Sequence, residues 1–246
     1  MAARDLGPRE LAALGERAEA LVEAAARILL GRERRDVLRA LGKAKTVDEM
    51  DAILADVLTR YRSRQGIFYR RWLARLLTVD TRLYLEASAA INPGATPKTG
   101  ARALPARQAR KAATEIVTTS AKRLERLHDR WKAANGTVDD LMAEARSDHL
   151  NRRRLVKRAQ VIARTEARIM LAGGLHDGAV SGGLTKKRWR HDDRRKVPPA
   201  RANHVRFHGM TVPIGVPFPN GLQHPHEEGA PAGEVVNCQC VVVYLP

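Results

Sequence analysis

The sequence predicts an α+β fold: a body of long helices followed by a small α+β unit with a long helix, a few short β-strands and extended loops. Two observations predict this division. Apolar residues recur every three or four positions from residue 8 to about residue 172, which is the period of amphipathic helices. After the glycine pair at 182–183 they occur in short runs, and residues 241–244 read Val-Val-Val-Tyr, the clearest strand signal in the chain.

Long helices are expected in the first 90 residues. The apolar spacing predicts a helix over residues 8–41, which Gly42 ends. Thr46 and Glu49 have the spacing of a capping box, in which each residue's side chain satisfies an unpaired amide of the next helix. That helix continues toward residue 90, and its unusual length for a compact domain allows a break near Gly66.

A linker and further helices follow. Residues 92–105 contain three prolines and two glycines, and proline cannot continue a helix without losing amide bonds, so this stretch reads as a loop or linker. Helical spacing resumes over residues 106–134 and stops at the Asn-Gly pair 135–136. Thr137 suits the N-cap of another helix, and one more helix begins near residue 151.

The last third should hold the strands. Periodicity alone ends the helix that begins near residue 151 at about Ala172, because Gly173 and Gly174 each cost a helix about 1 kcal/mol relative to alanine. Strands are expected at residues 184–190, 210–214 and 240–245, and residues 197–207 read as irregular. The predicted regions are therefore helical at 1–91, linker at 92–105, helical at 106–150 and a C-terminal domain at 151–246.

The chain is strongly basic. It has 44 Lys and Arg against 27 Asp and Glu, a formal charge of +17, and residues 151–200 alone carry 14 basic and four acidic side chains. A single basic run is usually a solvated helix face, but two runs on a chain of this charge favour an acidic partner, for which we expect non-specific contacts to duplex DNA. Aromatic residues are only 4%, too few for a surface that binds single strands by base stacking. The candidate DNA-binding residues are Arg60, Arg62, Arg64, Arg70, Arg71, Arg152, Arg153, Arg154, Lys157 and Arg158.

The sequence lacks the motifs of secreted proteins, membrane proteins and several enzyme classes. No signal peptide is visible, and no segment has the roughly 18 to 20 apolar residues of a membrane span, so no membrane partner is expected. The two cysteines, Cys238 and Cys240, are too close for good disulfide geometry, which favours a reduced, cytosolic setting. Phosphate-binding loops, the GxSxG elbow and HExxH are absent, so we expect no enzyme of those kinds.

Reactive side chains concentrate near the C-terminus. The enriched residues are His191, Asp192, Asp193, His204, His208, His224, His226, Cys238 and Cys240. His204, His208, Cys238 and Cys240 form a ligand set acceptable to zinc, although a single residue between the cysteines is atypical. Satisfied loop histidines with small buried cysteines are the alternative. A third interpretation is catalytic, with a metal or His204 activating water near a bound phosphate.

The same region carries a resemblance to a known family. Its pieces, in chain order, are Ile162-Ala163-Arg164-Thr165-Glu166-Ala167-Arg168, Lys187-Arg188-Trp189, Asp192-Asp193-Arg194, His204, His208-Gly209, Val212, Val216-Pro217-Phe218 and Asn237-Cys238-Gln239-Cys240. Their order and spacing over residues 155–243 resemble the C-terminal domain of the phage Mu F-like minor head proteins, the phage head morphogenesis family. The sequence departs from the family pattern at Gln239, which stands where a basic residue is usual, and at residues 196–203, which look like a longer insert.

The resemblance implies a minor capsid protein. Such proteins lie inside the procapsid, associate with the portal and the major capsid protein, take part in head assembly in the host cytoplasm, and in some phages bind DNA. It also implies a longer helix, to about Val180. The family-signature residues would be Arg164, Thr165, Glu166, Trp189, Asp193, His204, Gly209, Asn237, Cys238 and Cys240.

Two other functions are alternatives to that of a minor capsid protein. A metal-dependent nuclease or phage-associated toxin would use the His/Cys residues. A host nucleoid or RNA-binding protein would explain the charge but leave the C-terminal pattern unexplained.

Overall fold

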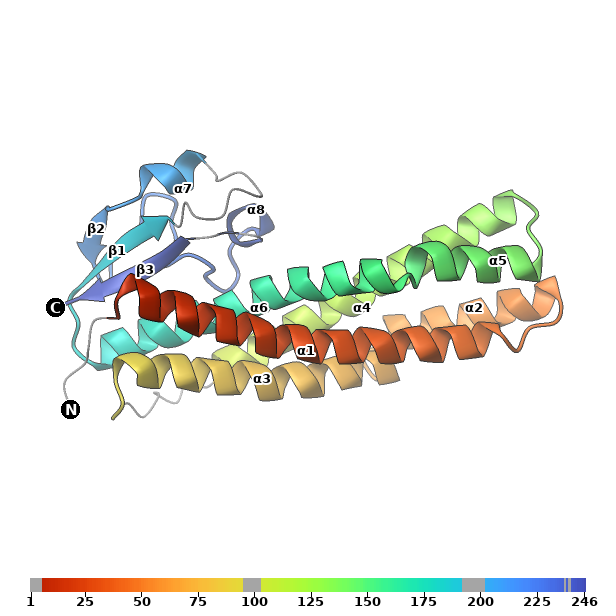
Figure 1. Ribbon diagram of the computed structural model, residues 1–246, viewed down its shortest axis with the longest axis horizontal. Coiled ribbons are helices and arrows are strands. Elements are labelled where there is room, and N and C mark those ends of the chain that lie inside the picture. Colours follow the sequence, from red (N-terminus) through yellow and green to blue (C-terminus); the bar gives the residue numbers. More distant parts are fainter. Residues whose placement is uncertain (1–5, 95–102, 192–201, 237, 239) are drawn as a thin grey trace. The chain divides into compact units, whose positions relative to one another are not determined.

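The computed structural model describes residues 6–94, 103–191, 202–236, 238 and 240–246 (Figure 1). It confirms the α+β class, with long helices and one small antiparallel sheet. The chain forms two compact units, each built from separated segments. We call Met1–Val22, Thr78–Gln108 and Val161–Pro246 the sheet unit, and Glu23–Leu77 and Ala109–Gln160 the helical unit.

The helices begin and end largely where their local signals lie. They are α1 (Pro8–Leu41), α2 (Val47–Arg62), α3 (Ile67–Ile91), α4 (Ala103–Ala133), α5 (Val138–Glu144) with a π-helical segment η1 (Ala145–His149), and α6 (Arg152–Ser181). Both capping signals are confirmed, since the Thr46 hydroxyl accepts the Glu49 amide at 3.2 Å and the Thr137 hydroxyl accepts the Asp140 amide at 3.2 Å. The break near Gly66 is confirmed too, because α2 ends at Arg62 and α3 begins at Ile67. A Cβ at Gly66 would lie 2.0 Å from the Arg60 carbonyl oxygen, so this turn requires glycine.

The helical unit has a core of large apolar side chains crossed by a buried polar network. Trp72 is fully buried and donates its indole hydrogen to Glu33 at 2.5 Å. Arg158 donates to the Ser120 hydroxyl at 2.9 Å and to the Ile116 carbonyl at 2.7 Å. Burial raises the pKa of Glu33, and the charge of Arg158 opposes that rise. Arg158 therefore compensates a buried carboxylate inside this unit.

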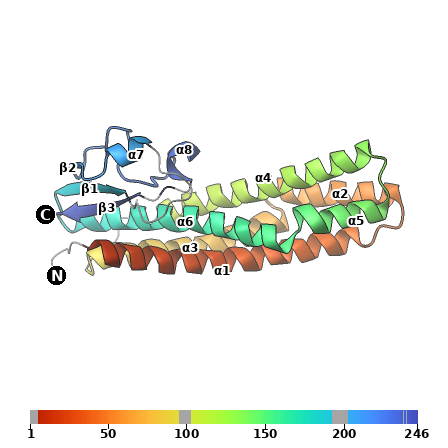
Figure 2. The same ribbon diagram turned by 45° about the horizontal axis from the view of Figure 1, so that its top comes forward.

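The sheet unit contains three strands in the order β2-β1-β3, with β1 (Lys186–His191) between β2 (Thr211–Pro213) and β3 (Cys240–Leu245). Both pairings are antiparallel, and in one of them Trp189 lies opposite Val242 and His191 opposite Cys240. Figures 1 and 2 both show the sheet beside the C-terminal half of α6. The strand expected at 240–245 is confirmed, and the other two lie within two residues of their predicted bounds.

Two predictions about this region need correction. Residues 202–206 form the short helix α7 (Ala202–Arg206) rather than an irregular segment, while residues 197–201 lie outside the described ranges. A second short helix, α8 (Ala232–Val235), lies before β3. The end near Ala172 predicted for α6 from periodicity is wrong, whereas the longer helix implied by the family resemblance matches the observed end at Ser181.

The glycines of α6 explain its length. A Cβ on Gly174 would lie 2.4 Å from the Tyr84 carbonyl oxygen, and one on Gly178 would lie 2.6 Å from that of Ser88. The small residues thus let α6 pack closely on α3. The packing offsets the roughly 1 kcal/mol that each glycine costs a helix relative to alanine.

The predicted linker at 92–105 falls mainly on residues 95–102, outside the described ranges, and α4 begins three residues earlier than expected, at Ala103. Pro105 fits there because the first turn of a helix leaves its amides unpaired in any case. The consecutive regions 1–91, 106–150 and 151–246 remain a prediction about domains along the sequence. Within the described part of the chain, no helix combines the length and apolar character needed to cross a bilayer.

Candidate metal centre

Three of the four predicted metal ligands meet in the sheet unit. The ligand atoms of His204, Cys238 and Cys240 all lie within 4.8 Å of one another. The His204 Nδ1 atom is 3.4 Å from the Cys238 Sγ and 3.7 Å from the Cys240 Sγ. The three residues are 1%, 3% and 1% exposed, respectively. We call these three residues the His/Cys cluster.

Local packing of the strands and α7 brings these residues together. Cys240 is the first residue of β3, and its amide donates to the Cys238 Sγ at 3.4 Å. Both sulfur atoms lie near the His204 Nδ1 atom. His204 lies on α7, where its ring meets the buried Trp189 edge-to-face at a centroid distance of 5.3 Å. Trp189 in turn packs against Phe218, at 4.9 Å. The edge-to-face contact of the His204 ring with Trp189 thus holds α7 against the sheet.

A carboxylate sets the orientation of His204. The His204 Nε2 atom is 2.6 Å from Glu234, whose carboxylate also accepts from Asn220 at 3.3 Å and Asn203 at 3.4 Å. Burial opposes a charge on His204, but Cys238 and Glu234 outweigh it and raise the pKa of its ring. The hydrogen bond from His204 lowers the pKa of Glu234. With Nε2 held by a carboxylate, Nδ1 is the atom that faces the sulfur atoms.

The surroundings of Cys238 favour the ionised form of its thiol. A hydrogen bond with Cys240 outweighs burial and lowers the pKa of Cys238 far below that of a free thiol, with further contributions from His226 and His204. The thiolate is the form of cysteine that binds metals and attacks electrophiles. The cluster could therefore hold a metal ion or serve as an activated thiol.

His208, the fourth predicted ligand, is not brought into the cluster. It is exposed, and its Nδ1 accepts the amide of His191 at 3.2 Å. The prediction rested on the four-residue spacing of His204 and His208, which places two side chains together only within one helix, and α7 ends at Arg206. The chain turns before His208, so the four-residue spacing no longer places the two rings side by side.

Two other histidines lie beside the cluster. His191 Nδ1 is 3.6 Å from the Cys240 Sγ. His226 is 3% exposed, adopts φ 63°, and has no hydrogen-bond partner on either ring nitrogen among the residues described. Sequence spacing singles out neither, because one ends a strand and the other lies in a loop. The only signal is the general enrichment of histidine near the C-terminus.

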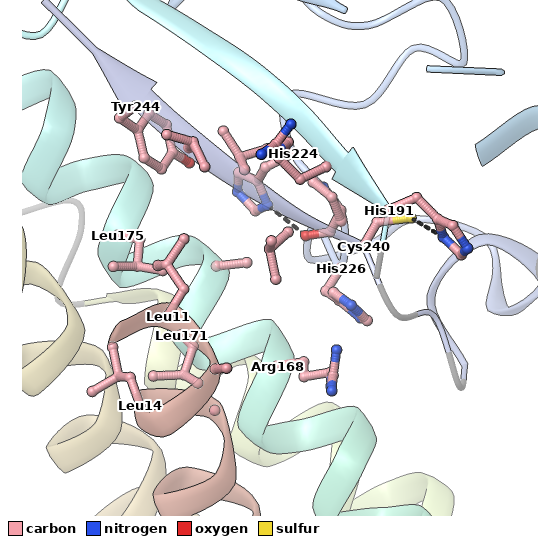
Figure 3. Close-up of a pocket in the computed structure, with 18 of the residues that line it drawn as sticks. Leu11, Leu14, Arg168, Leu171, Leu175, His191, His224, His226, Cys240 and Tyr244 are labelled. Carbon is pink, nitrogen blue, oxygen red and sulfur yellow. Dashed lines mark hydrogen bonds between the residues drawn. The ribbon is translucent and has the colours of Figure 1, made fainter. Parts of the chain in front are cut away.

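A cavity of about 500 Å³ adjoins these histidines within the sheet unit (Figure 3). Leu11 and Leu14 of α1 and Leu171 and Leu175 of α6 line its apolar side. In Figure 3, His191, His226 and Cys240 lie together at one end and Tyr244 at the other. The cavity thus reaches one sulfur atom of the cluster, while Cys238 and His204 do not line it.

The predicted DNA-binding residues have different environments, all in the helical unit. Four form ion pairs: Arg60 with Asp56, Arg62 with Glu125, Arg71 with Asp36 and Arg154 with Asp148. Arg158 differs from these four, because its guanidinium donates to Ser120 and to the Ile116 carbonyl within the unit. The remaining five are exposed and make no ion pair with any described residue: Arg64, Arg70, Arg152, Arg153 and Lys157.

The other described family-signature residues lie on α6 and in the turn before β2. Glu166 is buried on α6 and accepts from the Gln108 amide at 2.8 Å. Arg164 and Thr165 are half-buried on the same helix, and the Thr165 hydroxyl donates to the Val161 carbonyl at 3.1 Å. Gly209 has φ 82° in the turn before β2, a conformation that favours glycine. Asp193 and Asn237 lie outside the described residues.

Comparisons with protein-family models, with curated proteins and with solved structures find no match to this chain.

Proposed function

We propose that this chain is a minor head protein of a tailed phage or prophage, which acts in head assembly inside the procapsid beside the portal and the major capsid protein. One observation carries the proposal. Signature residues that are far apart in the sequence are neighbours in the fold, with Trp189 packed on His204 and His204 in contact with Cys238 and Cys240. Residues that define a domain family are expected to pack together in the fold, as these do.

The burial of the His/Cys cluster favours a structural role over the nuclease or toxin alternative. His204, Cys238 and Cys240 are each at most 3% exposed. A nuclease must bring a phosphate of a polymer into contact with its metal or general base. Incubation of the protein with DNA and divalent metals tests this point, and cleavage that His204→Ala abolishes would favour the enzyme.

Phage heads made with and without this gene provide the main test. We expect portal and major capsid genes beside it, and we expect the chain itself in purified particles by mass spectrometry. Deletion of the gene should lower the yield of DNA-filled heads, and a plasmid copy should restore it. Particles that lack the chain, with an unchanged yield after deletion, would refute the proposal.

The proposed contact with packaged DNA is assigned to a basic patch of the helical unit. Arg35 of α1 and Arg152 of α6 line one hollow of about 300 Å³, together with Arg27 and Arg34. Arg35, Arg152 and the adjacent Arg153 are exposed and make no ion pair within the described ranges. We call these three residues the basic patch. Unpaired guanidinium groups are the ones that can replace counterions on a phosphate backbone.

Salt dependence tests the basic patch. The wild-type affinity for a short duplex should fall steeply between about 50 and 200 mM salt. The triple variant Arg35→Gln, Arg152→Gln, Arg153→Gln should bind more weakly and lose about 0.9 from the slope of log affinity against log salt for each phosphate contact removed.

The matched control is the triple variant Arg60→Gln, Arg62→Gln, Arg154→Gln. It removes the same charge from arginines that are already paired with carboxylates, so its slope should stay close to that of the wild type. Equal losses in both triple variants would refute the patch. A wild-type affinity that does not change with salt would refute the contact with DNA.

A further inference from the structure

We propose that the sheet unit holds one zinc ion, bound by the sulfur atoms of Cys238 and Cys240, by the Nδ1 atom of His204, and by His226 as the fourth ligand. The site does not depend on the function proposed above. It differs from the set expected from the sequence in one member, because His226 replaces His208.

The distances within the His/Cys cluster match a zinc site. Zinc binds sulfur at about 2.3 Å and histidine nitrogen at about 2.0–2.1 Å in a tetrahedron, which places nitrogen and sulfur ligands about 3.6 Å apart. The His204 Nδ1 atom lies 3.4 Å and 3.7 Å from the two sulfur atoms. The three side chains thus already have the spacing of ligands around one ion.

We assign His226 as the fourth ligand because its buried ring lies beside Cys238 and its nitrogens make no hydrogen bond of normal geometry with the described residues. Neither of its nitrogens has a hydrogen-bond partner among the described residues, and the side chain is 3% exposed. A buried polar group without a partner costs free energy, so its persistence calls for an explanation. His226 lies close enough to Cys238 to act on its thiol, which places its ring beside the three ligand atoms of the His/Cys cluster.

The surroundings supply the outer contacts that metal ligands require. Glu234 holds the far nitrogen of His204 at 2.6 Å, the carboxylate–histidine arrangement that orients metal-bound imidazoles. The Cys240 amide donates to the Cys238 Sγ at 3.4 Å, which stabilises negative charge on that sulfur. Two thiolates with two imidazoles favour zinc over magnesium or calcium, which prefer oxygen ligands.

Such an ion would join three segments of the sheet unit. His204 lies on α7, His226 in the loop before α8, and the cysteines at the start of β3. Residues 214–231 contain no helix or strand, so no regular ladder of backbone hydrogen bonds holds that stretch. Metal binding would therefore contribute directly to the stability of the fold here.

The test begins with the wild-type protein alone. Reduced full-length chain, freed of metal and titrated with zinc against a chromogenic chelator, should bind one ion per chain. Cobalt in place of zinc should give the intense visible bands of a tetrahedral ion and the near-ultraviolet charge-transfer band of thiolate ligands. Failure to bind zinc, or a cobalt spectrum without thiolate bands, would overturn the proposal without any need for a variant.

Variants then assign the ligands. Cys238→Ser and Cys240→Ser should each lose the thiolate intensity, and His226→Gln should weaken zinc binding by more than the about 10–100-fold expected for the outer contact removed in Glu234→Gln. His208→Gln is the matched control and should bind as the wild type does. If His191→Gln weakens binding and His226→Gln does not, the assignment of the fourth ligand is wrong. Cysteine variants that bind like the wild type would refute the site.

Discussion

Asp80 on α3 is a buried carboxyl group that the sheet unit leaves unsatisfied. The side chain is fully buried, and neither oxygen has a hydrogen-bond partner in the described part of the chain. Burial, together with the charge of Glu166, raises the pKa of Asp80 well above its usual value of 3.8. Glu33 of the helical unit is buried as well, but it has Trp72, Ser120 and Arg158 as partners. The contrast makes Asp80 the residue whose ionisation should cost most stability.

Asp80→Asn should therefore stabilise the protein at neutral pH. Because the folded-state pKa is raised, the folded protein retains a proton that the unfolded chain releases above pH 3.8, and stability falls as pH rises from there toward the folded-state pKa. The urea midpoint of Asp80→Asn should exceed that of the wild type at about pH 7 and approach it at about pH 4.

The control for this prediction is Asp56→Asn, which changes a carboxylate that is half exposed on α2 and paired with Arg60. It should shift the midpoint little at either pH, since exposed pairs contribute about 0–1 kcal/mol. A lower midpoint for Asp80→Asn at neutral pH would show that the charged form of Asp80 stabilises the fold, contrary to this account.

At the scale of elements, the contact of α6 with α3 depends on missing side chains. Gly174→Ala would place a methyl group 2.4 Å from a backbone oxygen of Tyr84 and 2.8 Å from the Cβ of Ala87. Backbone cannot move aside as a flexible side chain can, so we expect a loss of about 1–3 kcal/mol in the free energy of unfolding. Urea unfolding followed by circular dichroism measures it.

Gly15→Ala on α1 is the matched control for this substitution. A Cβ at Gly15 meets nothing within 4 Å, so alanine should only improve helix propensity and stabilise by up to about 1 kcal/mol. Opposite signs at the two positions are expected. A Gly174→Ala variant as stable as the wild type would mean that the two helices separate without cost.

Sequence patterns predicted the elements well where their signals are local. The capping residue Thr46, the turn at Gly66 and the β-rich run of β3 each act within a few residues of themselves. The helix through Gly174 could not be predicted from periodicity, because what permits it is the backbone of Tyr84, ninety residues earlier. Helix propensity describes each residue by itself, whereas here the packing of α3 against Gly174 determines that α6 continues.

The candidate site was predicted only in part, for a related reason. Residues on regular elements, such as Cys240 on β3, could be placed by pattern. His208 lies outside the His/Cys cluster because the short helix α7 ends before it. His226, which we propose in its place, lies in a loop with φ 63° that residue spacing does not indicate. Loop conformations depend on the contacts of the whole unit, which spacing along the chain does not encode.

At the scale of the whole molecule, the two units should respond differently to zinc. All four proposed ligands belong to the sheet unit, whereas the helical unit is held by its own apolar core and the Glu33 network. A ligand that binds one folded part stabilises that part and whatever unfolds with it. Metal removal is therefore a way to ask whether the units open independently.

Amide hydrogen exchange on the full chain, with and without zinc, measures this response. Removing the ion should speed exchange in α7, in the loop around His226 and at the start of β3, while α2 and α5 keep their protection, because no ligand lies in the helical unit. The His208→Gln variant should behave like the wild type in both conditions. Faster exchange throughout α2 as well would show that the units unfold as one, and unchanged exchange around the His/Cys cluster would mean that zinc does not hold these three segments together.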